Sequence, residues 1–177
     1  MTLFKELQAV TLAEFEAMEK QEGLTYELID GVVMMSPRPA IKHQRISGNI
    51  YHELRTILKG RNCEPIQEID LVLEQNNFVP DLMVVCDENL DEMIHYDKPP
   101  LIVVEIISPS SGSRDYFVKR RAYKELGVQE YWIVSPEEKC IMIICFATDE
   151  EGRYCEGQVK SFVMPEIMID LSSVFTQ

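Results

Sequence analysis

Two carboxylates stand inside apolar stretches of this sequence. Glu105 interrupts the aliphatic run LIVVEII at residues 101–107, and Asp81 follows Pro80 at the start of a second apolar run, LMVVC. A run as apolar and β-branched as the first predicts a strand that is buried on both faces. An unpaired carboxylate there would cost several kcal/mol or take up a proton, so Glu105 must reach solvent, have a cationic partner or bind a metal ion.

Side-chain alternation gives each acid apolar neighbours on its own face of its strand. If the two strands pair, Asp81 and Glu105 can lie side by side, and two close carboxylates cannot both stay ionised cheaply without a cation. Mg²⁺ or Mn²⁺ suits oxygen ligands of this kind. The spacing leaves one alternative open, in which Asp81 only begins a strand and Glu105 faces water.

A lysine occurs in the apolar face of a helix that is predicted over about residues 113–126. Tyr116, Lys119, Tyr123 and Leu126 follow the spacing i, i+3, i+7, i+10, which is one helix face. Lys119 in that stripe either extends its ammonium group to solvent or contacts an anion. The two strand carboxylates are the candidates, so three coupled groups are expected.

The elements that would position these groups are predicted from periodicity and turn residues. A capping box predicts a short helix after Thr11, Asp30-Gly31 predicts a hairpin, and an apolar stripe predicts a helix over about residues 43–59. Apolar runs predict strands at about residues 63–73, 78–86, 101–108 and 130–134, then a hairpin of KCIMIICFA with YCEGQVKSFVM. Asp170 is expected to cap a final short helix.

The order of helix, three strands, helix and strand predicts an α/β domain with helices packed on a mixed sheet. A length of 177 residues with 46% apolar content predicts one globular domain over residues 1–177. Apolar runs are too short to span a bilayer, and the N-terminus has no signal-peptide core, so we expect a cytoplasmic protein without a membrane partner. The five cysteines are odd in number and form no CxxC pair, which favours reduced thiols over disulfides or a zinc site.

The net charge of −13 at first argues against a nucleic-acid ligand. Basic residues are nevertheless concentrated in two segments: residues 38–61 carry a local charge of +5 and residues 112–124 carry +4, which leaves −22 on the rest. Two basic segments on an acidic body could form a surface for an anionic ligand. The alternative is that these charges only keep the helices soluble.

A connected series of motifs extends over most of the chain. YELIDG is followed by VPD before an apolar strand, then by VVEIISPSS, RDYFVKRRAY and GVQEYWIV. Together they resemble the Uma-two (Uma2) family of restriction-type endonucleases, within the PD-(D/E)xK nuclease superfamily, over about residues 26–175. The resemblance implies a restriction-endonuclease-like core, preceded by a helix and a hairpin and followed by a hairpin.

The resemblance also implies a role for individual residues. Asp81 corresponds to the Asp of "PD" and Glu105 to the acid of "ExK", but Ile107 occupies the position of the lysine. The family pattern moves that lysine onto Lys119 in the following helix. It further implies the backbone carbonyl of Ile106 as a metal ligand.

Glu27 of YELIDG matches an upstream acid of the family and would complete the metal site, as a ligand directly or through water; the alternative is an exposed hairpin glutamate. The implied function is a metal-dependent endonuclease that uses Mg²⁺ or Mn²⁺ to hydrolyse phosphodiester bonds, with DNA as the expected partner. Basic residues expected at the nucleic-acid backbone are His43, Arg45, Lys59, Arg120 and Arg121. For His43, a core histidine at a helix end is an equal alternative.

The main competing hypothesis is a non-catalytic binding module on a nuclease-like fold, in which Asp81, Glu105 and Lys119 form a structural ion network. Many enzymes that cut duplexes act as dimers, so a homodimer is a possible state. The sequence contains no Walker A loop, no GxGxxG turn and no GxSxG elbow, so nucleotide-binding and serine-hydrolase functions have no support.

Overall fold

The computed structural model describes residues 9–107 and 113–176, with the backbone alone for residues 113–116. In this part of the chain the helices are α1 (Leu12–Glu16), α2 (Ile41–Ile57), the 3₁₀ helix η1 (Leu90–Glu92), α3 (Ser113–Glu125) and α4 (Leu171–Val174). None of the helices in the described ranges is long and apolar enough to cross a membrane.

A six-stranded mixed sheet forms the centre of the molecule, in the order β10-β9-β8-β7-β6-β3. Its strands are β3 (Glu64–Gln67), β6 (Leu82–Val85), β7 (Ile102–Ile106), β8 (Glu130–Ser135), β9 (Cys140–Cys145) and β10 (Glu150–Tyr154). Strands β7 and β8 pair in parallel, and the other neighbours pair antiparallel. The mixed sheet expected from the sequence is therefore present.

Two smaller sheets accompany the central one. A four-stranded sheet has the order β2-β1-β5-β4, and β11 pairs with β12. Their strands are β1 (Leu24–Ile29), β2 (Val32–Pro37), β4 (Leu71–Leu73), β5 (Asn76–Phe78), β11 (Gln158–Lys160) and β12 (Met168–Asp170).

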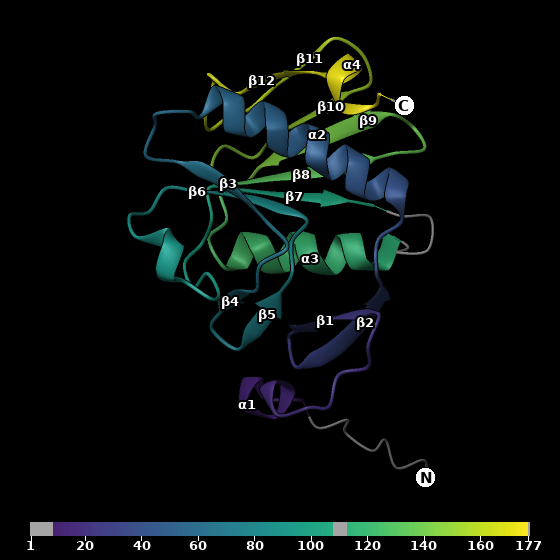
Figure 1. The fold of residues 1–177 in the computed structure, drawn as a ribbon, viewed down its shortest axis with the longest axis vertical. Coiled ribbons are helices and arrows are strands. Elements are labelled where there is room, and N and C mark those ends of the chain that lie inside the picture. The colour runs from purple at the N-terminus through teal and green to yellow at the C-terminus, as the bar shows by residue number, and fades with distance from the viewer. Residues whose placement is uncertain (1–8, 108–112, 177) are drawn as a thin grey trace.

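Helix α3 lies between the central sheet and the four-stranded sheet (Figure 1). Its buried Ala122 and Tyr123 share one apolar cluster with Phe78 of β5 and with Val103 of β7. Helix α2 covers the opposite face of the central sheet together with β11, β12 and α4 (Figure 1). A residue on the inner faces of α3 can therefore reach strands of two different sheets.

Local signals in the sequence explain several element boundaries. Thr11 and Glu14 form the predicted capping box at the start of α1. Asp30 and Gly31 both have positive φ, 50° and 75°, as a two-residue hairpin turn between β1 and β2 requires. Asp170 caps α4 by accepting a hydrogen bond from the backbone N–H of Ser172.

Two predicted strands are each divided in the structure. The run over residues 63–73 forms β3 in the central sheet and β4 in the four-stranded sheet, and the run over residues 78–86 continues β5 and then forms β6. The breaks lie at Glu68, which has φ of 47°, and at Pro80, which has no N–H to donate to a ladder. Asp81 therefore stands where the chain enters the central sheet.

The predicted C-terminal hairpin is also wrong in its second strand. Strand β9 pairs with β10, which begins at Glu150 inside the segment expected to be the turn. The later segment forms β11, which pairs with β12 instead. Apolar content alone could not identify β10, because three of its five residues are charged and only Tyr154 is a large apolar residue.

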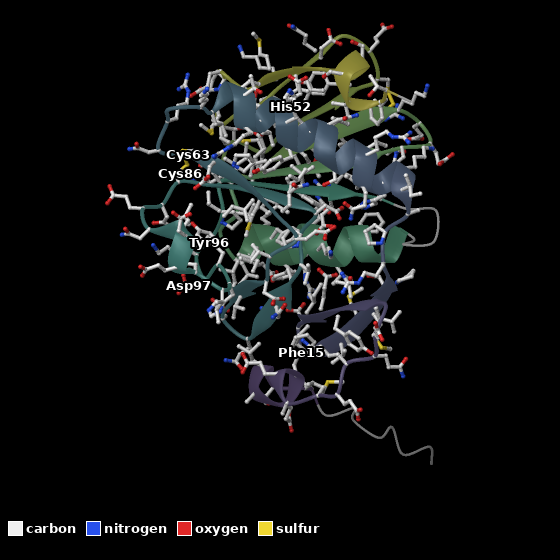
Figure 2. All side chains as sticks on the ribbon, viewed as in Figure 1. Phe15, His52, Cys63, Cys86, Tyr96 and Asp97 are labelled. Carbon is white, nitrogen blue, oxygen red and sulfur yellow. A yellow bond between two sulfur atoms is a disulfide. The ribbon has the colours of Figure 1, made fainter. Side chains whose placement is uncertain are left out.

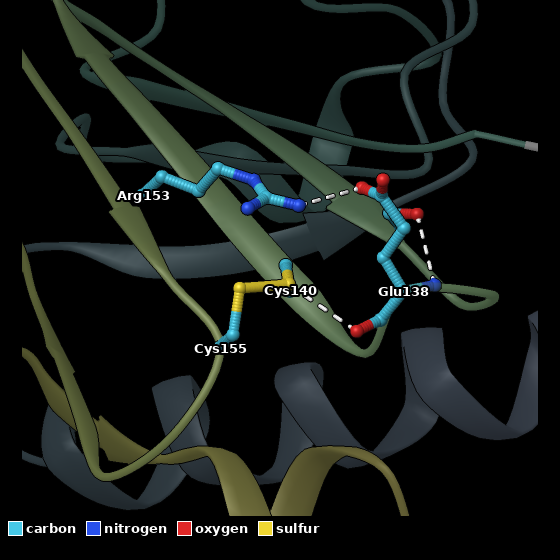
Figure 3. Close-up of a disulfide and its surroundings, with 5 residues drawn as sticks. Glu138, Cys140, Arg153 and Cys155 are labelled. Atoms are coloured by element: carbon cyan, nitrogen blue, oxygen red, sulfur yellow. Dashed lines mark hydrogen bonds and ion pairs between the residues drawn. A yellow bond between two sulfur atoms is a disulfide. The ribbon is translucent and has the colours of Figure 1, made fainter.

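The expectation of five reduced cysteines is wrong for four of them. Cys63 is bonded to Cys86 and Cys140 to Cys155, while Cys145 is free and buried (Figures 2 and 3). The registers β3–β6 and β9–β10 set the members of each pair opposite one another, which sequence spacing does not reveal. Each disulfide joins an edge strand of the central sheet to its inner neighbour.

Candidate active site

Asp81 and Glu105 meet at one end of the central sheet. Strands β6 and β7 pair antiparallel with Leu82 opposite Val104, and this register sets Asp81 opposite Glu105. Their side chains are only 15% and 12% exposed. The alternative in which Glu105 simply faces water is therefore excluded.

Lys119 bridges the two larger sheets. Its Nζ lies 2.9 Å from Glu105 Oε1 on β7 and 2.8 Å from Glu27 Oε1 on β1. The side chain is 11% exposed, because α3 is enclosed between the sheets. The structure thus places Lys119 in the inward-facing stripe of the helix, next to Tyr123; the side chain of Tyr116 lies outside the described residues.

Glu27 is buried rather than exposed on its hairpin. Its Oε1 accepts a hydrogen bond of 2.9 Å from the backbone N–H of Val79, in addition to the contact with Lys119. Val79 lies in the short connection between β5 and β6, two residues before Asp81. Glu27 is therefore fixed by the same connection that positions Asp81.

Asp81 is held by the end of β7 and by the first turn of α2. The backbone N–H of Ile106 donates to Asp81 Oδ2 at 2.7 Å. His43 Nε2 lies 3.2 Å from the same oxygen and 3.1 Å from the carbonyl oxygen of Ile106. Three atoms that can bind a proton or a cation therefore converge at this point.

Burial and neighbouring charges act on Glu105 in opposite directions. Burial raises the pKa of Glu105, the ammonium of Lys119 lowers it, and the carboxylates of Asp81 and Glu27 raise it again, with a result of about 7. Tyr123 donates a hydrogen bond of 2.8 Å to Glu105 Oε1. A cation bound beside Glu105 would lower this pKa and keep the carboxyl group fully ionised at neutral pH.

The cationic groups respond to the same carboxylates. Burial lowers the pKa of Lys119, but Glu105 and Glu27 outweigh it and hold the pKa well above its usual value. Burial likewise lowers the pKa of His43. Hydrogen bonds to Asp81 and to the Ile106 carbonyl, together with the negative charges of Asp81 and Glu105, outweigh burial and raise this pKa above its usual value. Lys119 therefore stays charged near neutral pH.

The donor set suits a hard divalent cation. Asp81 Oδ2 and the Ile106 carbonyl both point at the position of His43 Nε2, and Glu105 faces Asp81 across the strand pair. Within residues 9–107 and 113–176, no three His, Cys, Asp or Glu side chains are grouped to hold a metal. A cation would thus use the carbonyl and water besides carboxylates, as Mg²⁺ commonly does.

A family model described as Uma2, "Putative restriction endonuclease", matches residues 12–171. The chain belongs to the Uma2 family. Among relatives, the "Uncharacterized protein slr1290" of Synechocystis sp. is 29% identical over 126 residues, which cover 69% of this chain and 66% of that protein. The matched region thus spans just under two thirds of that relative's length.

The fold of this Uma2 chain is also found in a solved structure. A crystal structure titled as a putative nuclease belonging to DUF820, from Anabaena variabilis, superposes with a TM-score of 0.80 at 20% identity. The match covers 94% of this chain and 97% of the other. The two proteins therefore share their architecture of helices on a mixed sheet.

The basic residues expected at a nucleic-acid backbone form two separate groups in this Uma2 structure, one on and after α2 and one on α3. Arg120 pairs with Glu151, and Arg121 with Asp30, and both arginines line one pocket with Lys124. Arg45 is exposed near the start of α2, whereas Lys59 follows the end of that helix. Of these two, Arg45 is the nearer along α2 to the helix turn that carries His43.

Two residues of this Uma2 site acquire contacts that sequence reasoning missed. Tyr123 was assigned only to the packing stripe, yet its hydroxyl contacts Glu105. Its position one turn after Lys119 is the signal that could have identified it. For His43 the sequence leaves a phosphate contact and a core position open; the structure shows it in contact with Asp81 and Ile106, and only the tertiary structure brings these segments together.

Proposed function

We propose that this Uma2 protein is a metal-dependent endonuclease that hydrolyses phosphodiester bonds, with DNA as the expected substrate. The observation that carries the proposal is the set of Asp81, Glu105 and Lys119 at one end of the sheet, with Lys119 Nζ 2.9 Å from Glu105. The restriction-endonuclease-like core belongs to the same proposal and is supported by the sheet order around β6 and β7.

Asp81, Glu105 and the carbonyl of Ile106 would hold Mg²⁺ or Mn²⁺. When bound, such an ion lowers the pKa of a coordinated water and neutralises charge on the scissile phosphate. Burial keeps the two carboxylates in a region where electrostatic interactions are stronger than in water.

Lys119 would stabilise the negative charge that develops on the phosphate, or orient the attacking water. It is charged before substrate arrives, because Glu105 and Glu27 raise its pKa. Glu27 acts as a positioning residue: it holds Lys119 Nζ at 2.8 Å and is itself fixed by the N–H of Val79.

A specific observation also favours a second candidate, a non-catalytic module. Lys119 is already ion-paired with two acids, Glu27 and Glu105, at hydrogen-bond distance. A buried network of this kind can serve the fold alone. The two candidates differ in whether any nucleic acid is cut.

Supercoiled plasmid DNA and structured RNA incubated with the full chain test the proposal. We expect nicking of DNA with Mn²⁺ or Mg²⁺ and none with a chelator. Asp81→Asn should abolish it, whereas Asp149→Asn, a change at an exposed acid on the β9–β10 turn, should leave it unchanged. A parent protein that cuts neither nucleic acid with either metal would contradict the proposal and favour the non-catalytic module.

A further inference from the structure

We propose that the exposed face of α2 around Gly48 is the surface on which a DNA backbone lies beside the candidate active site, with its closest approach at Gly48. The inference rests on the proposed function, because it names where the same substrate would be held. It begins with a glycine inside a helix that nothing in the described part of the fold requires.

Gly48 stands in the interior of α2. Glycine is a poor helix former, because it loses more backbone freedom on folding than other residues. The φ of Gly48 is not positive, so the backbone conformation does not demand a glycine. A Cβ added there would meet no described heavy atom within 4 Å outside its own stretch of helix, so packing does not demand one either. Close approach of a ligand to the helix backbone is the physical reason that remains.

The residues around Gly48 form an exposed row along α2 that carries positive charge and no acid. The row follows the spacing i, i+3, i+4, i+7, i+11, i+14, which is one face of a helix. Its members are Ile41, Gln44, Arg45, Gly48, His52 (Figure 2) and Arg55. Surfaces of this kind attract the phosphates of nucleic acids.

Arg45 is the cation of this row that is available to a phosphate. It is next to Gly48 on the helix surface, at the i, i+3 spacing, and it has no ion pair among the described residues. Arg55 is instead paired with Glu64 of β3 at 2.7 Å. Because His52 lies one turn after Gly48, a phosphate resting on the glycine would be within reach of both Arg45 and His52.

The row begins next to the carboxylates of the site. His43, in the first turn of α2, lies 3.2 Å from Asp81, and Gly48 follows about 7.5 Å further along the helix axis. A strand of DNA advances about 3.4 Å per nucleotide. A strand that follows α2 from a scissile phosphate at Asp81 and Glu105 would therefore pass over Gly48 about two nucleotides away.

A second copy of the chain is the other occupant that a helix glycine would suit, but the side chains of the row argue against it. In a symmetric dimer the same patch meets itself, so the cations of the row would face cations. Ile41, 79% exposed, is the only large apolar side chain of the row, whereas the core of a dimer interface is largely apolar. A polyanion therefore fits this face better.

Gly48→Leu tests the surface, because it should change stability and binding in opposite directions. Leucine is a good helix former, so the melting temperature should rise by about 2–4 °C. Affinity for a short DNA duplex, measured with a chelator or with Ca²⁺ in place of Mg²⁺, should fall roughly tenfold or more, as for the loss of one charged contact. The salt slope of binding should fall by about 0.9.

Thr56→Leu is the matched control, since Thr56 is exposed on the same helix but lies outside the row. It adds the same side chain and should leave DNA binding unchanged. Gly48→Ala is the second variant if Gly48→Leu folds poorly, and it should shift stability and binding in the same two directions. Structured RNA is measured in parallel, and a loss of binding confined to RNA would overturn the assignment of DNA.

The two levels of the account fail in different ways. DNA binding by Gly48→Leu with the affinity and salt slope of the parent would overturn the surface and leave the proposed function standing. A dimeric parent that Gly48→Leu converts to monomers, measured by light scattering, would assign the face to a second copy instead. Weakened binding in a protein that cuts no nucleic acid would support the surface and contradict the nuclease. A parent that binds neither DNA nor RNA would overturn both.

Discussion

At the scale of single residues, opposing interactions within the site set the pKa of Glu105. Lys119 and Tyr123 bind its Oε1 and favour the charged form. Burial and the carboxylates of Asp81 and Glu27 act in the other direction and raise its pKa to about 7. In the metal-free protein this carboxyl group is therefore near half-protonation at neutral pH.

This pKa predicts a pH dependence of stability. Between about 4.5 and about 7 the folded protein holds a proton on Glu105 that the unfolded chain has released. The contribution of Glu105 to stability is thus fully present below pH 4.5 and is lost as the pH rises to 7, with a magnitude of about 3 kcal/mol. Glu105→Gln, which does not titrate, should flatten this part of the profile.

Thermal unfolding from pH 4.5 to pH 8 in the presence of a chelator measures the effect. Glu138→Gln, at an exposed acid in the β8–β9 turn, is the control and should follow the parent. Equal slopes for the parent and Glu105→Gln would show that Glu105 keeps an ordinary pKa.

At the scale of elements, α3 makes the site possible because it lies between two sheets. Lys119 forms ion pairs with Glu105 of the central sheet and with Glu27 of the four-stranded sheet. The helical spacing in the sequence was sufficient to place Lys119 on the inner face, since one stripe of α3 is apolar apart from this lysine. It could not show that the second sheet also faces α3.

The positions of Asp81 and Glu105 could likewise be predicted only in part from the sequence. Alternation within each apolar run predicted the faces of Asp81 and Glu105, and the antiparallel register of β6 with β7 brings the two together. The division of the runs at Glu68 and Pro80 was not predicted, because apolar residues occur on both sides of each break. Contacts of His43 with β7 depend on tertiary packing across 63 residues of sequence, which no local pattern encodes.

The disulfides at the two edges of the central sheet predict a redox effect on stability. Closed loops of the observed sequence separations, 23 and 15 residues, each stabilise by about 3 kcal/mol in the chain-entropy account. Reduction with dithiothreitol should lower the melting temperature, and Cys155→Ser should remove about half of that response.

Alkylation in denaturant without a reductant, followed by mass spectrometry, gives the number of free thiols. We expect one, at Cys145. Five alkylated cysteines in the protein as purified would contradict both cross-strand bonds.

At the scale of the whole molecule, the acidic body neutralises much of the basic surface. Ion pairs join basic residues of both positive segments to acids, as for Lys42 with Glu137, Arg55 with Glu64 and Lys124 with Asp149. Arg45 and Lys59 have no ion pair among the described residues. The net charge of −13 therefore leaves few cations for phosphate contacts.

Arg45 is the better placed of these two cations, and this predicts a difference in nucleic-acid binding. Arg45 follows His43 by two residues, whereas Lys59 lies about 20 Å further along the axis of α2. Arg45→Ala should weaken binding to all sequences and reduce the salt slope by about 0.9, the value for one phosphate contact. Lys59→Ala should have a smaller effect, and an unchanged slope in Arg45→Ala would show that Arg45 only solvates the helix.

The proposed hydrolysis depends on the ammonium group of Lys119. Because Lys119 is ion-paired with Glu27 and Glu105, Lys119→Met should lower the melting temperature of the metal-free protein, and Mg²⁺ should restore part of the loss. Lys124→Met is the matched control, since Lys124 lies on the same helix and its ion pair with Asp149 is exposed.

Mn²⁺-dependent nicking of plasmid DNA by folded Lys119→Met, measured well below its melting temperature, is the most direct test. We predict a loss of roughly 10²-fold or more relative to the parent, as for the removal of one preorganised electrostatic group, with Lys124→Met close to the parent. A folded Lys119→Met protein that nicks as well as the parent would contradict the catalytic role of the lysine and the mechanism built on it.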